Sequence, residues 1–148
     1  MTTYEVIDAI CDSVNPILFL ASIGVLTYFL IKRNYKHSVF VGLGILYGLL
    51  VTYGILFIDT KMHFWESIGM DYSTHTAFAF AMCSVIGIFT KKPVLMAVIL
   101  AVYIIAMLYQ KYHTVADIAT TLLVLSALVL PFLFLLKRNS IKAEELAY

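Results

Sequence analysis

The chain has 148 residues, of which 62% are hydrophobic and 13% are charged, about half the charged fraction of ordinary soluble domains. Too few polar side chains remain to cover a soluble core, so the excess apolar surface is expected to face lipid. A net charge of +1 excludes a basic nucleic-acid-binding surface as the main function. We therefore expect residues 1–148 to form one small membrane domain with no nucleic-acid partner.

Five uninterrupted apolar runs are long enough to cross a bilayer. In hydrocarbon each backbone polar group must be paired within its own element, so such runs have to be helices. The sequence thus predicts an all-α integral membrane bundle of five transmembrane helices. The first run is not expected to be a cleavable signal peptide, because the residues before it are acidic rather than basic. In chain order the runs are Val14–Ile31, Ser38–Ile58, Thr74–Thr90, Pro93–Tyr109 and Thr114–Leu136.

Small residues and a proline mark features within these runs. Gly44 and Gly48 have the small-x-x-x-small spacing that is typical of closely packed membrane helices. Pro131 is expected to kink the end of the last helix. Cys11 and Cys83 are too few and too far apart to indicate a disulfide framework or a metal motif.

The charged residues divide unequally between the two faces that five alternating spans define. Because Lys and Arg in short loops mark the cytoplasmic side, the N-terminus is expected outside and the C-terminus in the cytoplasm, in a plasma (inner) membrane. Eight of the ten basic residues fall on one face: Lys32, Arg33, Lys36, Lys91, Lys92, Lys137, Arg138 and Lys142. Seven of the nine acidic residues fall on or near the other: Glu5, Asp8, Asp12, Asp59, Glu66, Asp71 and Asp117.

Three of the four histidines, His63, His75 and His113, lie on the outer face. His75 begins the third run and His113 the fifth, so antiparallel packing could bring them into one site. Asp117 follows His113 by four residues, a spacing that puts both side chains on one face of a helix. The fourth histidine, His37, is expected to be a solvated loop residue.

The pairing of His113 with Asp117 has a chemical and a structural interpretation. An Asp inside a transmembrane helix is costly unless it is paired or functional. A carboxylate on one imidazole nitrogen raises the basicity of the other, which suits a nucleophilic or basic histidine, and His75 could then protonate a leaving group. The same spacing is compatible with a structural His–Asp pair, with His75 an unrelated interface residue.

Two stretches of sequence carry a family resemblance. Asp71-Tyr-Ser-Thr-His75-Thr-Ala-Phe-Ala-Phe80 resembles the Pro-Ser-Gly-His-Thr-Ala-x-Ala-Phe motif of the type 2 phosphatidic acid phosphatase superfamily of membrane lipid phosphatases. His113-Thr-Val-Ala-Asp117 is similar to the His, three residues, Asp that closes the last motif of that family. The resemblance implies a core that lacks one N-terminal helix of the usual six. It also implies that His113 forms a phosphohistidine, Asp117 orients His113, and His75 protonates the leaving group.

The phosphate-binding part of the family pattern differs in this sequence. The first motif lacks its Pro and Gly, and Met107 stands where the family has an Arg. Lys61 and Lys111 are the outer-face cations that could substitute, or else ordinary snorkelling lysines. Ser73 and Thr74 could add hydroxyls beside the free N–H groups of the third helix, or simply cap it. His63 lies in an aromatic-rich loop, Lys61–Tyr72, which is either part of an aromatic belt or a lid, and it completes the substrate-binding candidates.

The function predicted from these residues is a lipid phosphatase or phosphotransferase that acts at the outer membrane face on a lipid phosphate or pyrophosphate. No cofactor or metal is expected, and the partners are the lipid substrate and the membrane. One alternative is a metal-dependent hydrolase, with His63, His75, His113 and an Asp as zinc ligands. The others are a general-base hydrolase or transferase acting on a lipid, and an inactive relative with a structural role.

Overall fold

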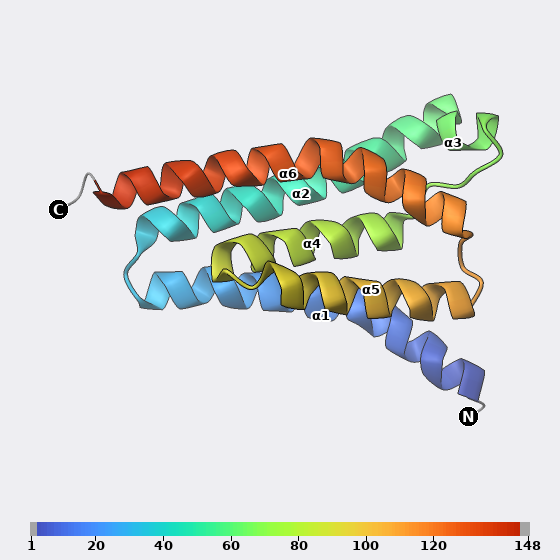
Figure 1. Ribbon diagram of the computed structural model, residues 1–148, viewed down its shortest axis with the longest axis horizontal. Coiled ribbons are helices and arrows are strands. Elements are labelled where there is room, and N and C mark those ends of the chain that lie inside the picture. The colour runs from blue at the N-terminus through green and yellow to red at the C-terminus, as the bar shows by residue number, and fades with distance from the viewer. Residues whose placement is uncertain (1–2, 146–148) are drawn as a thin grey trace.

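The computed structural model describes residues 3–145, and every regular element in that range is a helix (Figure 1). The all-α prediction is confirmed. The elements in chain order are α1 (Thr3–Ile31), α2 (Tyr35–Met62), α3 (Phe64–Ser67), α4 (Thr74–Thr90), α5 (Pro93–Tyr109) and α6 (Val115–Glu145).

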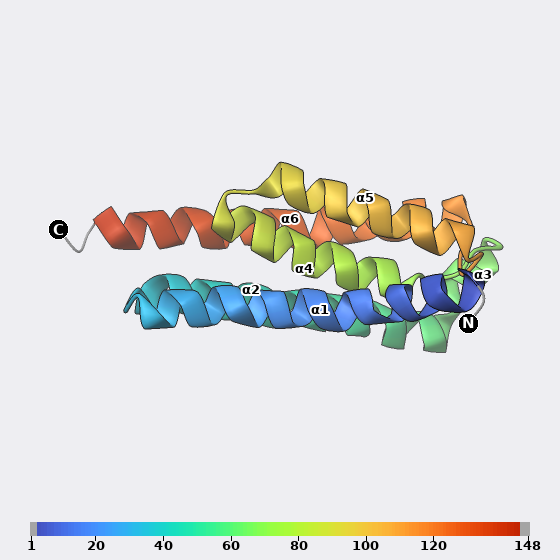
Figure 2. The same cartoon turned by 90° about the horizontal axis from the view of Figure 1, so that it is seen from below.

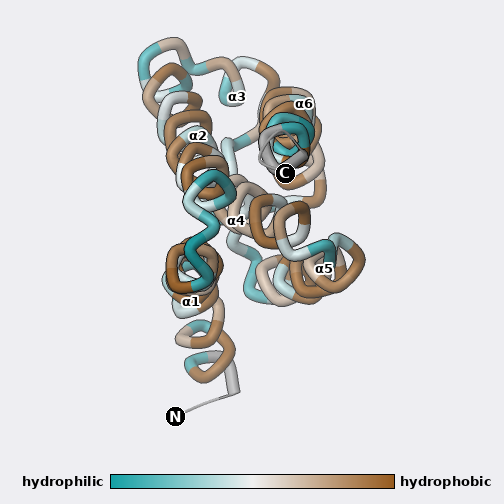
Figure 3. Tube along the Cα trace, turned by 90° about the vertical axis from the view of Figure 1, so that its left-hand side faces the viewer, coloured by the Kyte–Doolittle hydropathy of each residue, from teal (hydrophilic) through white to brown (hydrophobic). Residues whose placement is uncertain are grey.

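The five longer helices lie side by side along one axis and form an elongated bundle (Figures 1 and 2). Helix α4 is central, since it packs against α1, α2, α5 and α6. Its inner surface is built from small side chains, and Ala77, Ala79 and Ala81 are completely buried. Viewed along the bundle, α4 lies between the other helices (Figure 3).

Three helices are long and apolar enough to cross a membrane: Glu5–Ile31, Tyr35–Met62 and Val115–Lys142. Helices α4 and α5 are also apolar but have 17 residues each, which gives about 25 Å of length against a hydrocarbon core of about 30 Å. Large apolar side chains are exposed along the outside of the bundle, among them Ile17, Leu50, Val102 and Leu123. Length and composition thus describe a membrane protein.

The predicted runs locate all five longer helices but not all their ends. Helices α4 and α5 have the predicted bounds, whereas α1, α2 and α6 extend beyond the apolar runs. An apolar run marks the part of a helix that suits lipid, and polar residues at its ends can continue the same backbone hydrogen bonding. Because α1 begins at Thr3, Pro16 lies well inside the helix. The N-terminal part of α1, before this proline, leans away from the bundle (Figure 1). Helix α6 likewise continues past Pro131.

The small-residue pair in α2 marks a close helix contact, as predicted. A Cβ atom placed on Gly48 would lie 3.1 Å from the Cβ of Ala81 in α4. A Cβ on Gly44 would lie 3.0 Å from the Leu133 side chain in α6. Both distances are shorter than ordinary van der Waals contact, so glycine allows α2 to approach α4 and α6 this closely.

The two ends of the bundle differ in charge. One end, which we call the basic end, contains the α1–α2 turn with the first turn of α2, the α4–α5 turn and the C-terminal part of α6 (Figure 1). The eight basic residues named above all belong to these segments. The opposite end, the histidine end, contains α3 and the first turns of α4 and α6, and therefore His63, His75 and His113.

The prediction that His37 is a solvated loop residue is wrong. His37 lies in the first turn of α2 and is 6% exposed. Its Nδ1 atom is 3.0 Å from Ser140 Oγ, and its ring lies 4.9 Å from the Phe29 ring. Helix α2 begins at Tyr35, earlier than the apolar run does, and this turns the imidazole toward α1 and α6 rather than toward solvent.

Candidate active site

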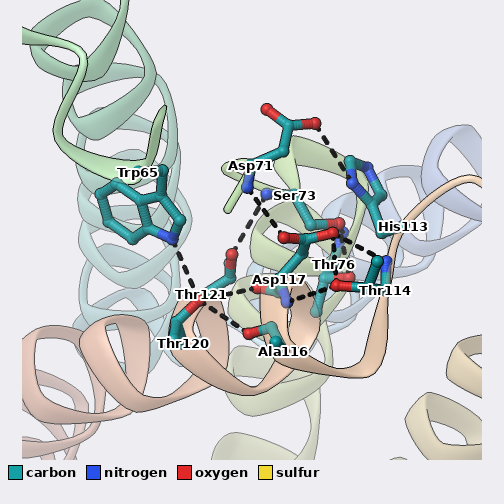
Figure 4. A network of polar contacts seen from close by, with 10 residues as sticks. All are labelled: Trp65, Asp71, Ser73, Thr76, His113, Thr114, Ala116, Asp117, Thr120 and Thr121. Carbon is teal, nitrogen blue, oxygen red and sulfur yellow. Dashed lines mark hydrogen bonds and ion pairs between the residues drawn. The ribbon is translucent and has the colours of Figure 1, made fainter. Parts of the chain in front are cut away.

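Asp117 sits at the start of α6 in a reciprocal capping arrangement (Figure 4). Its Oδ2 accepts hydrogen bonds from the Thr114 backbone N–H and hydroxyl, both at 2.7 Å. The Asp117 backbone N–H in turn donates to Thr114 Oγ1 at 3.2 Å. Thr114 and Asp117 thus form a capping box that satisfies two of the backbone N–H groups left free at the start of the helix.

The same carboxylate fixes the segment that leads into α4. Asp117 Oδ1 accepts a hydrogen bond from the Asp71 backbone N–H at 2.8 Å. One turn further along α6, Thr121 Oγ1 accepts from the Ser73 backbone N–H at 3.1 Å. Asp117 and Thr121 are both buried. The loop before α4 is therefore held on α6 by two buried side chains.

The carboxylate beside His113 is that of Asp71 rather than that of Asp117. His113 Nδ1 lies 3.3 Å from Asp71 Oδ2, with the His113 side chain 12% exposed and the Asp71 side chain 72% exposed (Figure 4). The contact lacks hydrogen-bond alignment, and Nδ1 has no other hydrogen-bond partner.

The predicted side-by-side placement of His113 and Asp117 rested on a helical spacing that does not apply here. Helix α6 begins at Val115 and Thr114 is its cap, so His113 precedes the helix. Residues four apart share a face only within a helix. The Thr114-x-x-Asp117 spacing is itself a readable capping signal, and it accounts for the position of Asp117.

His75 is exposed in the first turn of α4. Asn15 Nδ2 lies 3.3 Å from His75 Nδ1 and donates to the His75 carbonyl at 3.4 Å. With the Asn15 amide donating to Nδ1, the ring proton of neutral His75 is on Nε2. Asn15 Oδ1 is buried and has no hydrogen-bond partner.

Tyr112 links the two histidines along the chain and in space. Its ring stacks on His75 with a centroid separation of 6.2 Å and an interplanar angle of 11°. Its hydroxyl donates a hydrogen bond to Asp8 of α1, and this bond raises the pKa of Tyr112. Because Tyr112 immediately precedes His113, the stacked pair brings the start of α4 next to the segment that carries His113.

A cleft of 540 Å³ opens beside His75 between α1, α2 and α4. Its walls are mainly apolar, with Phe19, Leu49 and Phe78 among them. Its residues with polar groups are Asp12, Asn15, Tyr53, Thr74 and His75, and no Lys or Arg of the described chain lines it. The cleft therefore suits an apolar chain with a polar group near His75.

The remaining predicted substrate-binding residues are not gathered at this cleft. Ser73 is buried and caps α4 by accepting from the Thr76 N–H. His63 is exposed, and its Nδ1 lies 2.7 Å from Glu66 Oε2. Lys61, in the last turn of α2, and Lys111 are both exposed and do not line the cleft. Among the predicted binding residues, only Thr74 contributes to its wall.

The aromatic loop after α2 is anchored rather than loose. Trp65 Nε1 donates to Thr120 Oγ1 at 3.1 Å, and the Trp65 backbone N–H donates to Asp59 at 2.9 Å. Tyr72 is buried, and its hydroxyl donates to the Thr52 carbonyl at 3.0 Å. Burial raises the pKa of Tyr72, so this hydroxyl stays protonated and keeps its donor role. These contacts attach both ends of the loop to α2 and α6.

The arrangement does not fit the zinc alternative. Within residues 3–145, no three His, Cys, Asp or Glu side chains gather closely enough to hold a metal ion. His63 pairs with Glu66, His113 with Asp71, and His75 with Asn15. The three histidines thus have separate partners instead of a common centre.

Neither the family models nor the curated proteins or solved structures include a match to this chain. The functional interpretation therefore depends on the geometry of the histidine end. Sequence reasoning missed Asp71, Tyr112 and Asn15 as parts of this region. Asp71 belongs to the motif that resembles the phosphatase family, but its contact with His113 depends on the path of the loop before α4.

Proposed function

We propose that the protein is a membrane-embedded lipid phosphatase or phosphotransferase in which His113 is the nucleophile. The observation that carries this proposal is the contact between His113 Nδ1 and Asp71, at the same end of the bundle as the apolar cleft that contains His75. A carboxylate at Nδ1 orients the ring and leaves Nε2 as the reactive nitrogen. The resemblance to the type 2 phosphatidic acid phosphatases supports the same roles for the two histidines.

The membrane placement that suits this function has five spans. Helices α4 and α5 pack alongside the long apolar helices, and one short turn joins α4 to α5 at the basic end. The concentration of Lys and Arg at that end favours a cytoplasmic location for it. The histidine end and the N-terminus then face the extracytoplasmic side of a plasma (inner) membrane, where the cleft is open to lipid headgroups.

The reaction would proceed in two steps. His113 Nε2 attacks the phosphorus of a lipid phosphate, the bond to the leaving oxygen breaks, and that oxygen takes the Nε2 proton of a doubly protonated His75. In this imidazolium form of His75, the Asn15 amide is turned so that Oδ1, which has no other partner, accepts from the Nδ1–H. Asp71 stabilises the positive charge that develops on the His113 ring. Water or an acceptor alcohol then attacks the phosphohistidine and gives up its proton to His75, which restores both histidines. The apolar walls of the cleft, including Phe19 and Phe78, would hold the lipid chain.

A second candidate function is general-base hydrolysis or transfer on a less charged lipid. It is favoured by the composition of the cleft, in which Asp12 is present and no Lys or Arg of the described chain is a lining residue. Charge-assisted donors are the usual source of stabilisation for a transferring phosphoryl group. In this alternative, the His113–Asp71 pair removes a proton from water or an alcohol, and no phosphohistidine forms.

The two candidates can be separated with purified protein in nanodiscs. We expect release of inorganic phosphate from phosphatidic acid or a prenyl pyrophosphate, retained in the presence of a chelator. His113→Ala should reduce this release at least about 10³-fold, whereas His63→Asn, at an exposed histidine of the same end, should retain it. Cleavage of an uncharged lipid ester without phosphate release would favour the general-base candidate, and activity unchanged by His113→Ala would contradict both.

A further inference from the structure

A second cavity, of 650 Å³, opens at the basic end of the bundle. It lies between the C-terminal half of α1, the start of α2, the α4–α5 turn and the last part of α6. It shares no lining residue with the cleft beside His75, which is at the opposite end. Its chemistry is therefore separate from that of the candidate active site.

Three lysines from two elements converge on this cavity. Lys91 and Lys92 come from the α4–α5 turn, and Lys137 comes from α6. Lys137 Nζ lies 5.5 Å from the centroid of the Phe89 ring, so its side chain reaches across the end of α4. No Asp or Glu lines the cavity in the part of the chain that the structure describes. The charged side chains that line this cavity within residues 3–145 are thus all basic.

The opposite wall of the cavity is apolar and reaches the outside of the bundle. Gly24, Val25 and Phe29 of α1 line it. Tyr28, which also lines it, is 54% exposed, and the neighbouring Ile31 is exposed too. A Cβ atom on Gly24 would meet nothing within 4 Å, so the space in front of this glycine is open. A free inorganic anion would use the lysines but not this wall, whereas a lipid would use both.

We propose that this cavity binds the anionic headgroup of a membrane phospholipid, with the phosphate at Lys91, Lys92 and Lys137 and the glycerol and upper chain along α1. Basic pockets between membrane helices attract anionic headgroups in this way. Because the lipid would contact α1, α4 and α6 together, it would bridge the three helices at this end. The proposal requires the membrane location but not the proposed reaction.

Spin-labelled lipids test the proposal directly. The full chain is reconstituted in phosphatidylcholine, and the fraction of motionally restricted label is compared for spin-labelled phosphatidylglycerol and spin-labelled phosphatidylcholine. Each basic residue near an anionic surface contributes roughly a fivefold preference. We expect the wild type to prefer phosphatidylglycerol, and Lys91→Gln/Lys92→Gln/Lys137→Gln to lose at least about fivefold of that preference.

A matched variant separates a cavity from diffuse surface charge. Arg33→Gln/Arg138→Gln/Lys142→Gln removes three exposed charges from the same end, and none of these residues lines the cavity. It also includes one residue with a positive φ, as the cavity variant does. This control should keep most of the preference. Equal losses in the two variants, or no preference in the wild type, would overturn the proposal.

A substitution that keeps every charge provides a second test. Gly24→Phe should fill the open space in front of α1 and reduce the phosphatidylglycerol preference, while Gly54→Phe, at another glycine with open space around it, should not. Inorganic phosphate should compete weakly with the labelled lipid. Full displacement by phosphate, with no effect of Gly24→Phe, would identify a free anion as the ligand and contradict lipid binding. None of these measurements depends on His113, so they stay informative if the proposed reaction is not observed.

Discussion

The two ends of the bundle each hold a mostly buried histidine, yet their surroundings give these histidines different chemistry. His113, at the histidine end, contacts the carboxylate of Asp71. His37, at the basic end, shares a hydrogen bond with the Ser140 hydroxyl and lines a cavity that contains three lysines. A carboxylate stabilises an imidazolium, whereas a hydroxyl among lysines does not. The partner of each histidine, rather than its burial, therefore decides whether it is suited to nucleophilic or basic catalysis.

The ends also differ in how their polar groups are held. At the histidine end, Asp117 accepts three hydrogen bonds and joins the α6 cap to the loop before α4. The lysines of the basic end line an open cavity instead. The first arrangement fixes the positions of side chains, and the second leaves room for a ligand. Substitutions at the two ends should accordingly change different measured properties.

The largest effect is expected at Asp71, which acts through His113. Asp71→Asn should lower lipid phosphate turnover about 10²–10⁴-fold, because the His113 imidazolium loses its neighbouring negative charge. Asp71→Glu, which keeps a carboxylate at this position, should recover part of the turnover, a rescue that a purely structural role would not produce. The matched control is Glu66→Gln, which alters the exposed His63–Glu66 pair of the same end. Unchanged turnover in Asp71→Asn would show that Asp71 does not act on His113.

The next largest effect is expected on stability at Asp117. Asp117→Ala removes three accepted hydrogen bonds and half of the capping box, so the free energy of unfolding should fall by about 2–4 kcal/mol. Titration with SDS in mixed micelles measures this change. Asp71→Ala leaves the Asp71 N–H in place and removes only an exposed carboxylate, so it should cost less than about 0.5 kcal/mol. Equal losses in the two variants would contradict the separate roles of these carboxylates.

A smaller effect is expected at the basic end. Ser140→Ala removes the hydroxyl beside His37 Nδ1 and should lower the free energy of unfolding by about 1 kcal/mol in the same titration. Ser126→Ala is the control, because Ser126 Oγ donates only to the Leu123 carbonyl within α6. We expect that change to be a few tenths of a kcal/mol. A loss at Ser140 as large as that at Asp117 would remove the distinction between the two ends.

Much of the fold could be predicted because apolar runs determine which segments suit lipid. The bounds of α4 and α5 were predictable since charged or polar turns flank them closely. The ends of α1 and α6 were not, because polar residues continue a helix without interruption. The burial of His37 was missed for a similar reason, since α2 begins before its apolar run does.

The candidate site was predictable in its location but not in its contacts. Alternating helices place His75 and His113 at one end, and the structure has both there. The carboxylate that contacts His113 could not be predicted without knowing where α6 begins. Because α6 begins at Val115, His113 lies outside the helix. The contact with Asp71 depends on a loop held by Asp117 and Thr121. Such long-range backbone contacts have no local sequence signal.

The measurement that tests the central claim most directly is the trapping of a phosphorylated intermediate. Protein in nanodiscs is mixed with a lipid phosphate carrying radioactive phosphorus and quenched during turnover. Label bound to the protein should be stable in base and labile in acid, as a phosphohistidine is, and mass spectrometry should place it on His113. His63→Asn should keep the label and His113→Asn should lose it. Turnover of the lipid phosphate with no label on the protein, or label that persists in His113→Asn, would contradict the account.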